Sequence, residues 1–330
     1  MKRTITPAQF LRRQLWHKIT GATLDGDLPD KIERITAEAT DFWFRSLEHP
    51  QHARMMADSL VRTALGLNPD TNGETLQRAA RRAPLLSHPE GPTMVAVPGA
   101  CSVCTDMECA AESVCLTGAF EKTDYGHRIN NERCLNCGFC IGACRAAAVS
   151  DKAEIVQVAR LLLDRNQEVA AVVAPAFAGQ FGSGIFGKQI SAALTAFGFD
   201  RVVEVALGAD VITIKEAEEY IRRRERGDPF MITSCCCPPF IRLVQKFRPH
   251  LAYLISDSVS PMIAIGRLLK AENPQLKVVF IGPCIAKKSE ARQPELAGAV
   301  DFVLTFEETA AMLQAGGVEV ASETPSLDLV

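Results

Sequence analysis

The sequence predicts an α/β fold for residues 151–330, with a largely parallel sheet covered by helices on both faces. Apolar, strand-like runs occur at 169–176, 201–207, 230–235, 276–284 and 300–306. Helix-like stretches, such as 216–226 and 238–247, lie between these runs. Because repeated strand–helix alternation is typical of parallel sheets, we expect one sheet with crossover helices. In such sheets, ligands bind beyond the carboxyl ends of the strands.

Composition limits the classes of protein that this chain can be. A length of 330 residues with 47% hydrophobic content predicts two or three domains with sizeable cores. The net charge is −3 and no long basic run occurs, which argues against nucleic acid or an anionic membrane surface as partner. No apolar run approaches the roughly 18 residues of a membrane span. No secretory signal follows Arg12 and Arg13, so we expect a cytoplasmic protein with reduced thiols.

Residues 1–95 predict a helical N-terminal region. Apolar residues recur at helical spacing in 7–20 and 75–86. Pro92 and Pro98 then flank a short strand-like piece at 93–97. The histidines of this region show no metal-ligand spacing, and docking is the only role that we suggest for it.

Cysteine placement is the most informative feature of the chain. None of the 12 cysteines precedes Cys101, and eight lie between Cys101 and Cys144. A long chain with these cysteines favours metal ligation over a disulfide scaffold. Residues 134–144 read "CLNCGFCIGAC", a CxxCxxCxxxC pattern in which three thiolates ligate one iron-sulfur cube and the fourth a second. Zinc is the alternative metal, but structural zinc sites usually take separated CxxC pairs.

The segment "CSVCTDMECAAESVCLTGAF" adds Cys101, Cys104, Cys109 and Cys115, and its end resembles the "CPTGAI" that closes each half of bacterial ferredoxins. The resemblance implies a small α+β ferredoxin-like domain at 96–150 that carries two 4Fe-4S clusters and conducts electrons. Its crossed ligation would give one cluster the ligands Cys101, Cys104, Cys109 and Cys144. The other cluster would take Cys115, Cys134, Cys137 and Cys140. The gaps in the first half are longer than usual, and Arg145 stands where proline normally follows the last cysteine.

The predicted catalytic part resembles the iron-only (FeFe) hydrogenases. The segments "APAFAGQFG", "GADVITIKEAEEY", "MITSCCCPPF", "SDSVSPM", "GPCIAKKSEARQPE" and "VDFVLTFEETAAML" follow the family's order. Of these, "TSCCCPP" and "GPC" correspond to the family's "TSCCPGW" and "MPCxxKKxE". The likeness covers roughly residues 96–330 and is greatest to a branch with "TSCCCP". It implies a hydrogenase-type catalytic domain at 151–330.

The resemblance also implies the residues of the active site. Cys237 and Cys284 would ligate the 4Fe-4S half of the active-site H-cluster, which also contains a two-iron subcluster. Cys236 would carry protons to the two-iron half, and Lys287 would face an anionic ligand there. The pocket walls would be Pro175, Ala176 and Pro283. The proton path would run through Glu219, Glu216 and Ser256, with Arg223 beside it.

Two departures from the family pattern bear on this site. Pro239, Phe240 and Gly282 replace the usual glycine, tryptophan and methionine. The family's third motif, "ExxxCxxGCxxGG", supplies two more cysteines, and no cysteine follows Cys284 here. We therefore expect an incomplete catalytic domain, from either a fragment or a natural truncation, and a whole H-cluster only in a complete protein.

The three adjacent cysteines allow two registers. Read from the prolines, Cys237 binds iron, Cys236 moves protons and Cys235 is the extra residue. Read from Thr233 and Ser234, both roles shift back by one and Cys237 is the extra residue. We favour the first register because the proline fixes the turn after the ligand.

The resemblance implies an oxidoreductase that interconverts H2 with protons and electrons. Its electron partner would be ferredoxin or another carrier, and H2 and protons would be its substrates, with no nucleic acid or membrane involved. The alternative is a non-enzymatic iron-sulfur protein: an electron carrier, a redox or H2 sensor, or a hydrogenase-like assembly factor.

Overall fold

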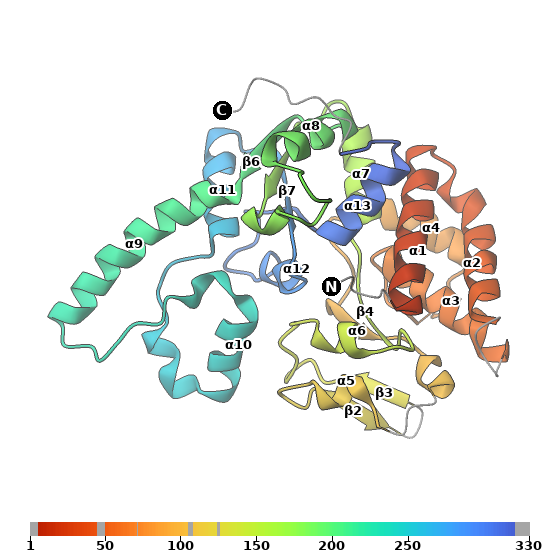
Figure 1. The fold of residues 1–330 in the computed structure, drawn as a ribbon, viewed down its shortest axis with the longest axis horizontal. Helices are drawn as coiled ribbons and strands as arrows, with labels where there is room; N and C mark the ends of the chain where they lie inside the picture. The colour runs from red at the N-terminus through yellow and green to blue at the C-terminus, as the bar shows by residue number, and fades with distance from the viewer. Residues whose placement is uncertain (1–5, 45–49, 71, 105–107, 124–125, 321–330) are drawn as a thin grey trace. The chain divides into compact units, whose positions relative to one another are not determined.

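A computed structural model describes residues 6–44, 50–70, 72–104, 108–123 and 126–320 of the chain (Figure 1). The chain forms two compact units. The N-terminal unit comprises Met1–Cys134, Gly138–Asp164 and Glu307–Glu323, and the C-terminal unit comprises Leu135–Cys137, Arg165–Phe306 and Thr324–Val330. The predicted boundaries at residues 95 and 150 stay a prediction, because the helices and most of the cysteine-rich segment share the N-terminal unit.

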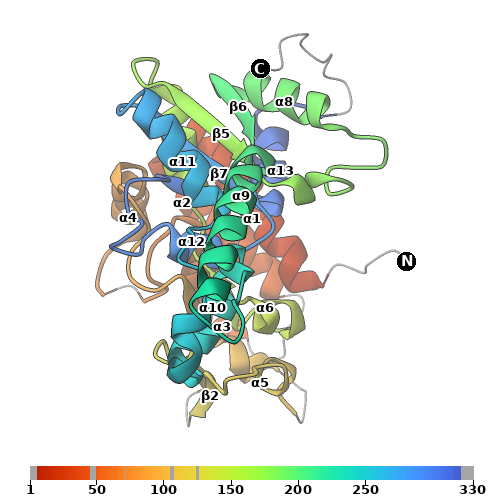
Figure 2. The same ribbon diagram turned by 90° about the vertical axis from the view of Figure 1, so that its left-hand side faces the viewer.

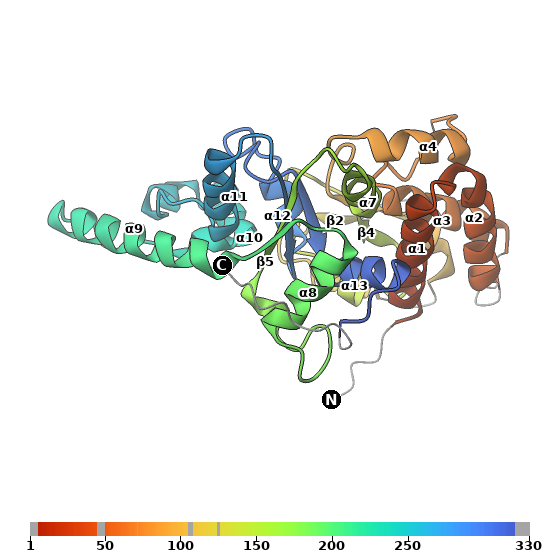
Figure 3. The same cartoon turned by 90° about the horizontal axis from the view of Figure 1, so that it is seen from above.

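Helices dominate the first part of the N-terminal unit, which confirms the predicted helical region. They are α1 (Pro7–Leu24), α2 (Leu28–Phe44), α3 (Pro50–Ala64), α4 (Leu76–Arg82) and the 3-10 turn η1 (Ala83–Leu85), joined by α7 (Ile155–Leu163) and, from Glu307, by α13 (Phe306–Ala315). Thr6 and Gln9 form a capping box that begins α1. Ile19, Ile32 and Met56 are completely buried. Figures 1 and 3 show α1 to α4 packed side by side.

Two small antiparallel sheets hold the cysteine-rich segment. β1 (Met94–Ala96) pairs with β4 (Val149–Asp151), and β2 (Phe120–Thr123) pairs with β3 (Gly126–Ile129). Along the chain, η2 (Ala100–Val103) and α5 (Ala110–Ser113) lie between β1 and β2, and α6 (Phe139–Ala143) lies between β3 and β4. The predicted strand at 93–97 is confirmed as β1, and it sits at the edge of the segment as the flanking prolines require.

The C-terminal unit contains a four-stranded parallel sheet, which confirms the α/β prediction. Its strands are β5 (Val169–Val173), β6 (Arg201–Glu204), β7 (Lys277–Gly282) and β8 (Phe302–Thr305), in the order β6-β5-β7-β8. All five residues of β5 are buried, as expected for a central strand. Figures 2 and 3 show α8 (Gly187–Phe197) and α11 (Pro261–Glu272) on opposite sides of β5 and β7.

The remaining elements of this unit are α9 (Val205–Glu225), α10 (Pro238–Phe247), α12 (Ala286–Glu290) and the 3-10 turns η3 (Pro175–Phe177), η4 (Ser234–Cys236) and η5 (Pro249–Leu254). Among the described residues, no helix is long and apolar enough to cross a membrane.

The strand predicted at 230–235 is wrong. Only Ile232 pairs, through one parallel bridge to Ile255, and Ser234 already begins the turn η4. Phe230 is half-exposed, so this run does not bury enough apolar surface for an inner strand. The predicted strand 201–207 is also shorter, because α9 begins at Val205 directly after β6. The three-cysteine stretch therefore follows an irregular segment, whereas "APA" and "GPC" do follow sheet strands.

Gly208 allows close packing of α9 on α11, which run beside each other in Figure 3. A Cβ atom at Gly208 would lie 2.6 Å from the carbonyl oxygen of Pro261, whereas one at Gly21, inside α1, would meet nothing within 4 Å. We expect Gly208→Ala to lower the free energy of unfolding by about 2 kcal/mol through overpacking. Gly21→Ala, the control, should raise it by about 0.5–1 kcal/mol through helix propensity. Denaturant unfolding measures both, and equal effects would contradict the close approach.

Candidate functional site

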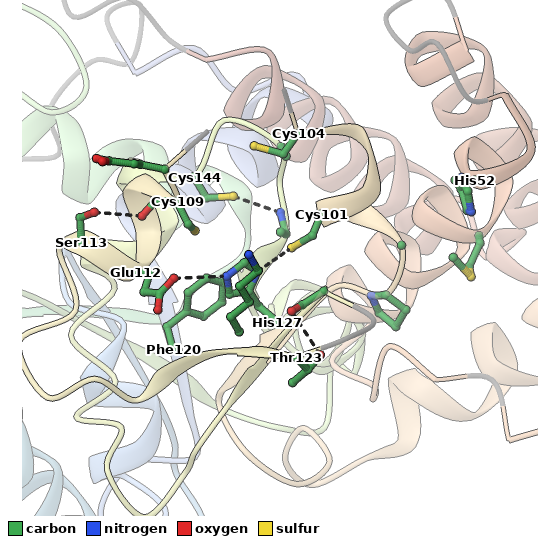
Figure 4. A pocket seen from close by; sticks show the side chains of 18 residues that line it. His52, Cys101, Cys104, Cys109, Glu112, Ser113, Phe120, Thr123, His127 and Cys144 are labelled. Carbon is green, nitrogen blue, oxygen red and sulfur yellow. Dashed lines mark hydrogen bonds and ion pairs between the residues drawn. The ribbon is translucent and has the colours of Figure 1, made fainter. Parts of the chain in front are cut away.

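One cavity of about 970 Å³ in the N-terminal unit is lined by four cysteines. They are Cys101, Cys104, Cys109 and Cys144. Figure 4 shows their sulfur atoms around a common space, with the hairpin of β2 and β3 below. Cys101 belongs to η2, Cys109 caps α5 and Cys144 follows α6, so three separate elements deliver these thiols.

These thiols lie close enough to affect one another electrostatically. Burial and, after it, negative charge on Cys144, Cys109 and Cys104 together raise the pKa of Cys101 to about 11. Burial also raises the pKa of Cys144, although the backbone N–H groups of Ala148 and Ala146 oppose this shift. Four thiolates here would repel one another unless a cation neutralised them. Four convergent sulfurs are the ligands that an iron-sulfur cube takes, so these residues fit such a group.

A repeated turn supports Cys115 and Cys144. The backbone N–H of Ala119 donates to Cys115 Sγ at 3.2 Å, and that of Ala148 donates to Cys144 Sγ at 3.3 Å. In both turns the third residue after the cysteine has positive φ, 58° at Gly118 and 54° at Ala147. The two halves of the segment therefore share one local geometry, although glycine is present in only one of them. N–H···S hydrogen bonds of this kind stabilise a thiolate ligand.

The second predicted ligand set is divided between the two units. Burial raises the pKa of Cys115, but hydrogen bonds from the backbone of Phe120, Ala119 and Thr117 and from the Thr117 side chain outweigh it and lower the pKa overall. Cys134 and Cys140 are half-buried, and Cys137 is exposed and belongs to the C-terminal unit. These four cysteines stay a predicted ligand set.

The three adjacent cysteines of the C-terminal unit have different surroundings. Cys235 is buried, whereas Cys236 and Cys237 are exposed. Burial and, to a lesser extent, a hydrogen bond with Glu216 together raise the pKa of Cys235 to about 12. Burial also raises the pKa of Cys284, which lies just after β7, and negative charge on Cys237 contributes to that shift. The predicted ligands Cys237 and Cys284 therefore lie near each other, and Glu216 contacts Cys235.

Glu219 is the centre of a buried hydrogen-bond network on α9. Ser256 Oγ donates to Glu219 Oε2 at 2.8 Å, and Arg223 Nε donates to Oε1 at 2.7 Å. The Asp257 N–H also donates to this carboxylate. Burial alone would raise the pKa of Glu219, but these donors together hold it below its ordinary value. Arg223 also donates to the Tyr253 and Ile255 carbonyls, so the network fixes residues 253–257 to α9.

Lys287 is buried and forms an ion pair with Glu290 at 2.6 Å within α12. Its positive charge partly opposes the rise in the pKa of both Cys284 and Cys235. The predicted wall residues Pro175, Ala176 and Pro283 are all exposed.

The sequence offered no signal for three residues beside the four-cysteine cavity. His127 Nδ1 lies 3.1 Å from Cys101 Sγ, and Glu112 and Phe120 contact the same imidazole. His127 is 26 positions from Cys101 and reaches it only through the β2–β3 pairing. Neither its spacing nor its neighbours resemble a metal-binding motif.

The lowered pKa of Glu219 makes stability depend on pH. Its ionised form contributes stability above the unfolded pKa of about 4.3, and this contribution is lost as pH falls through the lower folded value. Glu219→Gln should reduce the free energy of unfolding at pH 7 by about 3 kcal/mol, because Arg223 loses its buried partner. The difference from the unmodified chain should shrink below pH 4.

Glu218→Gln is the matched control, since Glu218 is exposed and pairs with Arg222 only at 3.9 Å. Its effect should stay within about 0.5 kcal/mol at every pH. Urea unfolding between pH 3 and pH 7 measures both variants, and a Glu219→Gln effect that is independent of pH would contradict the network.

Comparison with known proteins places part of this chain in a family. The family "Iron only hydrogenase large subunit, C-terminal domain" matches residues 167–328. Iron hydrogenase 1 of Clostridium pasteurianum is 31% identical over 188 residues, which are 51% of this chain and 33% of that protein. A cytosolic Fe-S cluster assembly factor, NAR1 of Meyerozyma guilliermondii, is 27% identical over 202 residues, which are 54% of this chain and 38% of that protein.

Among solved structures, an apo FeFe-hydrogenase HydA1 variant from Chlamydomonas reinhardtii aligns with a TM-score of 0.46 and 26% identity, covering 51% of this chain and 50% of that chain. The chain spans little more than a third of the length of the two curated relatives above. From the matched segment and these relatives, we conclude that residues 167–328 are similar to the C-terminal domain of an FeFe-hydrogenase-like family.

Proposed function

We propose that the chain is part of an iron-sulfur oxidoreductase of the FeFe-hydrogenase type, which interconverts H2 with protons and electrons. The convergence of Cys101, Cys104, Cys109 and Cys144 on one cavity carries this proposal. These four residues would hold one 4Fe-4S cluster, and Cys115, Cys134, Cys137 and Cys140 would hold another. When bound, the clusters supply one-electron transfer. The electron partner would be a ferredoxin or a similar carrier.

The crossed ligand assignment has support from the repeated turn. Cys115 and Cys144 each close one half of the segment, and each accepts an N–H bond from the fourth residue after it. Cys144 lies with the cysteines of the first half although it follows those of the second half in sequence. A tandem assignment would pair Cys144 with Cys134, Cys137 and Cys140, and it would leave the four-cysteine cavity unexplained.

In the C-terminal unit, Cys237 and Cys284 would ligate the cube of the active site. Their proximity supports the register read from the prolines for the iron ligand. The thiol that carries protons is better assigned to Cys235 than to Cys236. Cys235 is buried and hydrogen-bonded to Glu216, whereas Cys236 is exposed. The extra residue of "TSCCCP" would then be Cys236, between the two functional thiols.

The charged groups around this site would serve it in different ways. Lys287 would present its ammonium to an anionic ligand, and Glu290 would hold that side chain in position. Glu216 would exchange a proton with Cys235. The hydrogen bond between Ser256 and Glu219 would extend the path outward, while Arg223 keeps Glu219 ionised and in place. Pro175, Ala176 and Pro283 would border the pocket.

A second candidate is a hydrogenase-like protein without H2 activity: an assembly factor, an electron carrier or a sensor. Assembly factors named NAR1 are among the relatives at 27% and 28% identity. H2-dependent dye reduction by the anaerobically matured complete protein distinguishes the candidates, and infrared bands of iron-bound carbonyl and cyanide should accompany it in the enzyme.

Metal content tests the two clusters. We expect about eight iron and eight sulfide ions per chain after anaerobic reconstitution, from two cubes. Cys104→Ala and Cys137→Ala should each remove about four of both, because each deletes a ligand of a different cluster. Cys236→Ala, the control, should leave both counts unchanged. Stoichiometric zinc without sulfide in the unmodified chain would refute the cluster assignment.

Alkylation of the reduced, metal-free chain tests the roles of the adjacent thiols. Iodoacetamide should modify Cys236 at least about a hundredfold faster than Cys235 at pH 8, because Cys235 is buried and almost wholly protonated. Tandem mass spectrometry locates the adduct, and the rates should converge in denaturant. Glu216→Gln should keep Cys235 slow, since burial is the larger cause of its raised pKa. Comparable rates in the folded chain would contradict the assignment of Cys235.

A further inference from the structure

We propose that His127 donates a hydrogen bond from Nδ1 to the Cys101 thiolate, and that His127 and Glu112 together set the reduction potential of the cluster in the four-cysteine cavity. The inference rests on the proposed cluster, but it concerns residues that are outside the predicted ligand set. Figure 4 shows the chain of contacts, from Cys101 through the His127 ring to Glu112.

The β2–β3 hairpin brings His127 to Cys101. Gly126 has φ of 122°, and a Cβ atom there would lie 3.4 Å from Cys101 Cβ. The backbone therefore approaches the cysteine closely at a position that disfavours a side chain. The next residue, His127, then places Nδ1 3.1 Å from Cys101 Sγ.

Two further contacts fix the imidazole ring. The Phe120 ring, which is buried on β2, stacks on it with a centroid distance of 4.5 Å and an interplanar angle of 2°. On the opposite edge, Glu112 Oε2 lies 3.7 Å from Nε2. The His127 side chain is only 10% exposed, and its buried Nε2 has no hydrogen-bond partner within the part of the chain that the structure describes. A buried polar atom aimed at a carboxylate indicates that the Glu112 contact is part of the site.

The chemistry of the ligand assigns the donor. A thiolate bound to iron carries no proton and can only accept, so the shared proton must be on His127 Nδ1. Donation to a ligand sulfur stabilises the more negative, reduced state of a cluster, which raises its potential. The Glu112 carboxylate adds negative charge within 4.8 Å of Cys109 Sγ, another ligand of the same proposed cluster, and opposes reduction. The two residues should therefore shift the potential in opposite directions.

Three substitutions separate these effects. His127→Phe keeps a ring for stacking on Phe120 but removes the donor, and it should disfavour reduction about tenfold, or 59 mV for a one-electron couple. His127→Asn retains an N–H donor on a shorter side chain and should recover part of that shift. Glu112→Gln should shift the potential upward. Glu108→Gln, at another carboxylate lining the cavity, controls for a general loss of charge and should have a smaller effect.

The measurement is a redox titration followed by electron paramagnetic resonance, on the full chain with both clusters reconstituted. The second cluster acts as an internal reference for folding, and iron and sulfide counts report cluster retention. The expected result is retained clusters with opposite shifts for His127→Phe and Glu112→Gln. An unchanged potential in His127→Phe would overturn the proposal.

Selective loss of this cluster in His127→Phe would also overturn it. Sγ of Cys109, a carboxylate oxygen of Glu112 and a ring nitrogen of His127 lie within 4.8 Å of one another, so that loss would identify His127 as a metal ligand instead. Absence of any cluster from the unmodified chain is a separate result, and it would refute the proposed function before the role of His127 is tested.

Discussion

Repulsion between thiolates is the constraint on which the proposed electron-transfer site depends. Cys101, Cys104, Cys109 and Cys144 converge on one partly buried cavity, and negative charge on neighbouring thiols adds to burial in raising the pKa of Cys101 and Cys144. Such a group is costly unless metal neutralises it or the thiols remain protonated. The surrounding chain supplies donors to these sulfurs, from the Ala148 N–H and the His127 ring. Donors of this kind favour thiolate over thiol, and thiolate is the form that binds iron.

In the C-terminal unit, the surroundings of Cys235 favour the protonated thiol instead of the thiolate. Cys235 is buried beside the Glu216 carboxyl group, which favours the neutral thiol. The positive charge of Lys287 partly opposes this effect. The network around Glu219 ties residues 253–257 to α9 and leaves Glu219 ionised. A thiol that remains protonated near a fixed carboxylate suits proton exchange, whereas the exposed neighbour Cys236 has no such environment. One chain therefore gives its cysteines two kinds of surroundings, which suit the proposed metal ligation and the proposed proton exchange.

The sequence was sufficient for features that depend on local pattern. Buried apolar runs predicted β5 and β7 because central parallel strands are apolar on both faces. The run at 230–235 failed because only Ile232 finds a strand partner, and pairing partners are not encoded within a run. Glu219 and Arg223 are four residues apart on one helix and could be paired from sequence. Ser256 lies 37 positions away from Glu219, and only the family resemblance indicated that the two residues belong to one site. His127 escaped detection because its function depends on a hairpin that carries it to Cys101.

A crystal structure of the anaerobically reconstituted chain, with anomalous data collected at the iron edge, tests the central claim most directly. The account predicts a four-iron cluster bonded to Cys101, Cys104, Cys109 and Cys144, and a second bonded to Cys115, Cys134, Cys137 and Cys140. A single zinc ion in the four-cysteine cavity would contradict the account. So would a cluster bonded to Cys134, Cys137, Cys140 and Cys144, because the crossed ligation on which the electron path depends would then be absent.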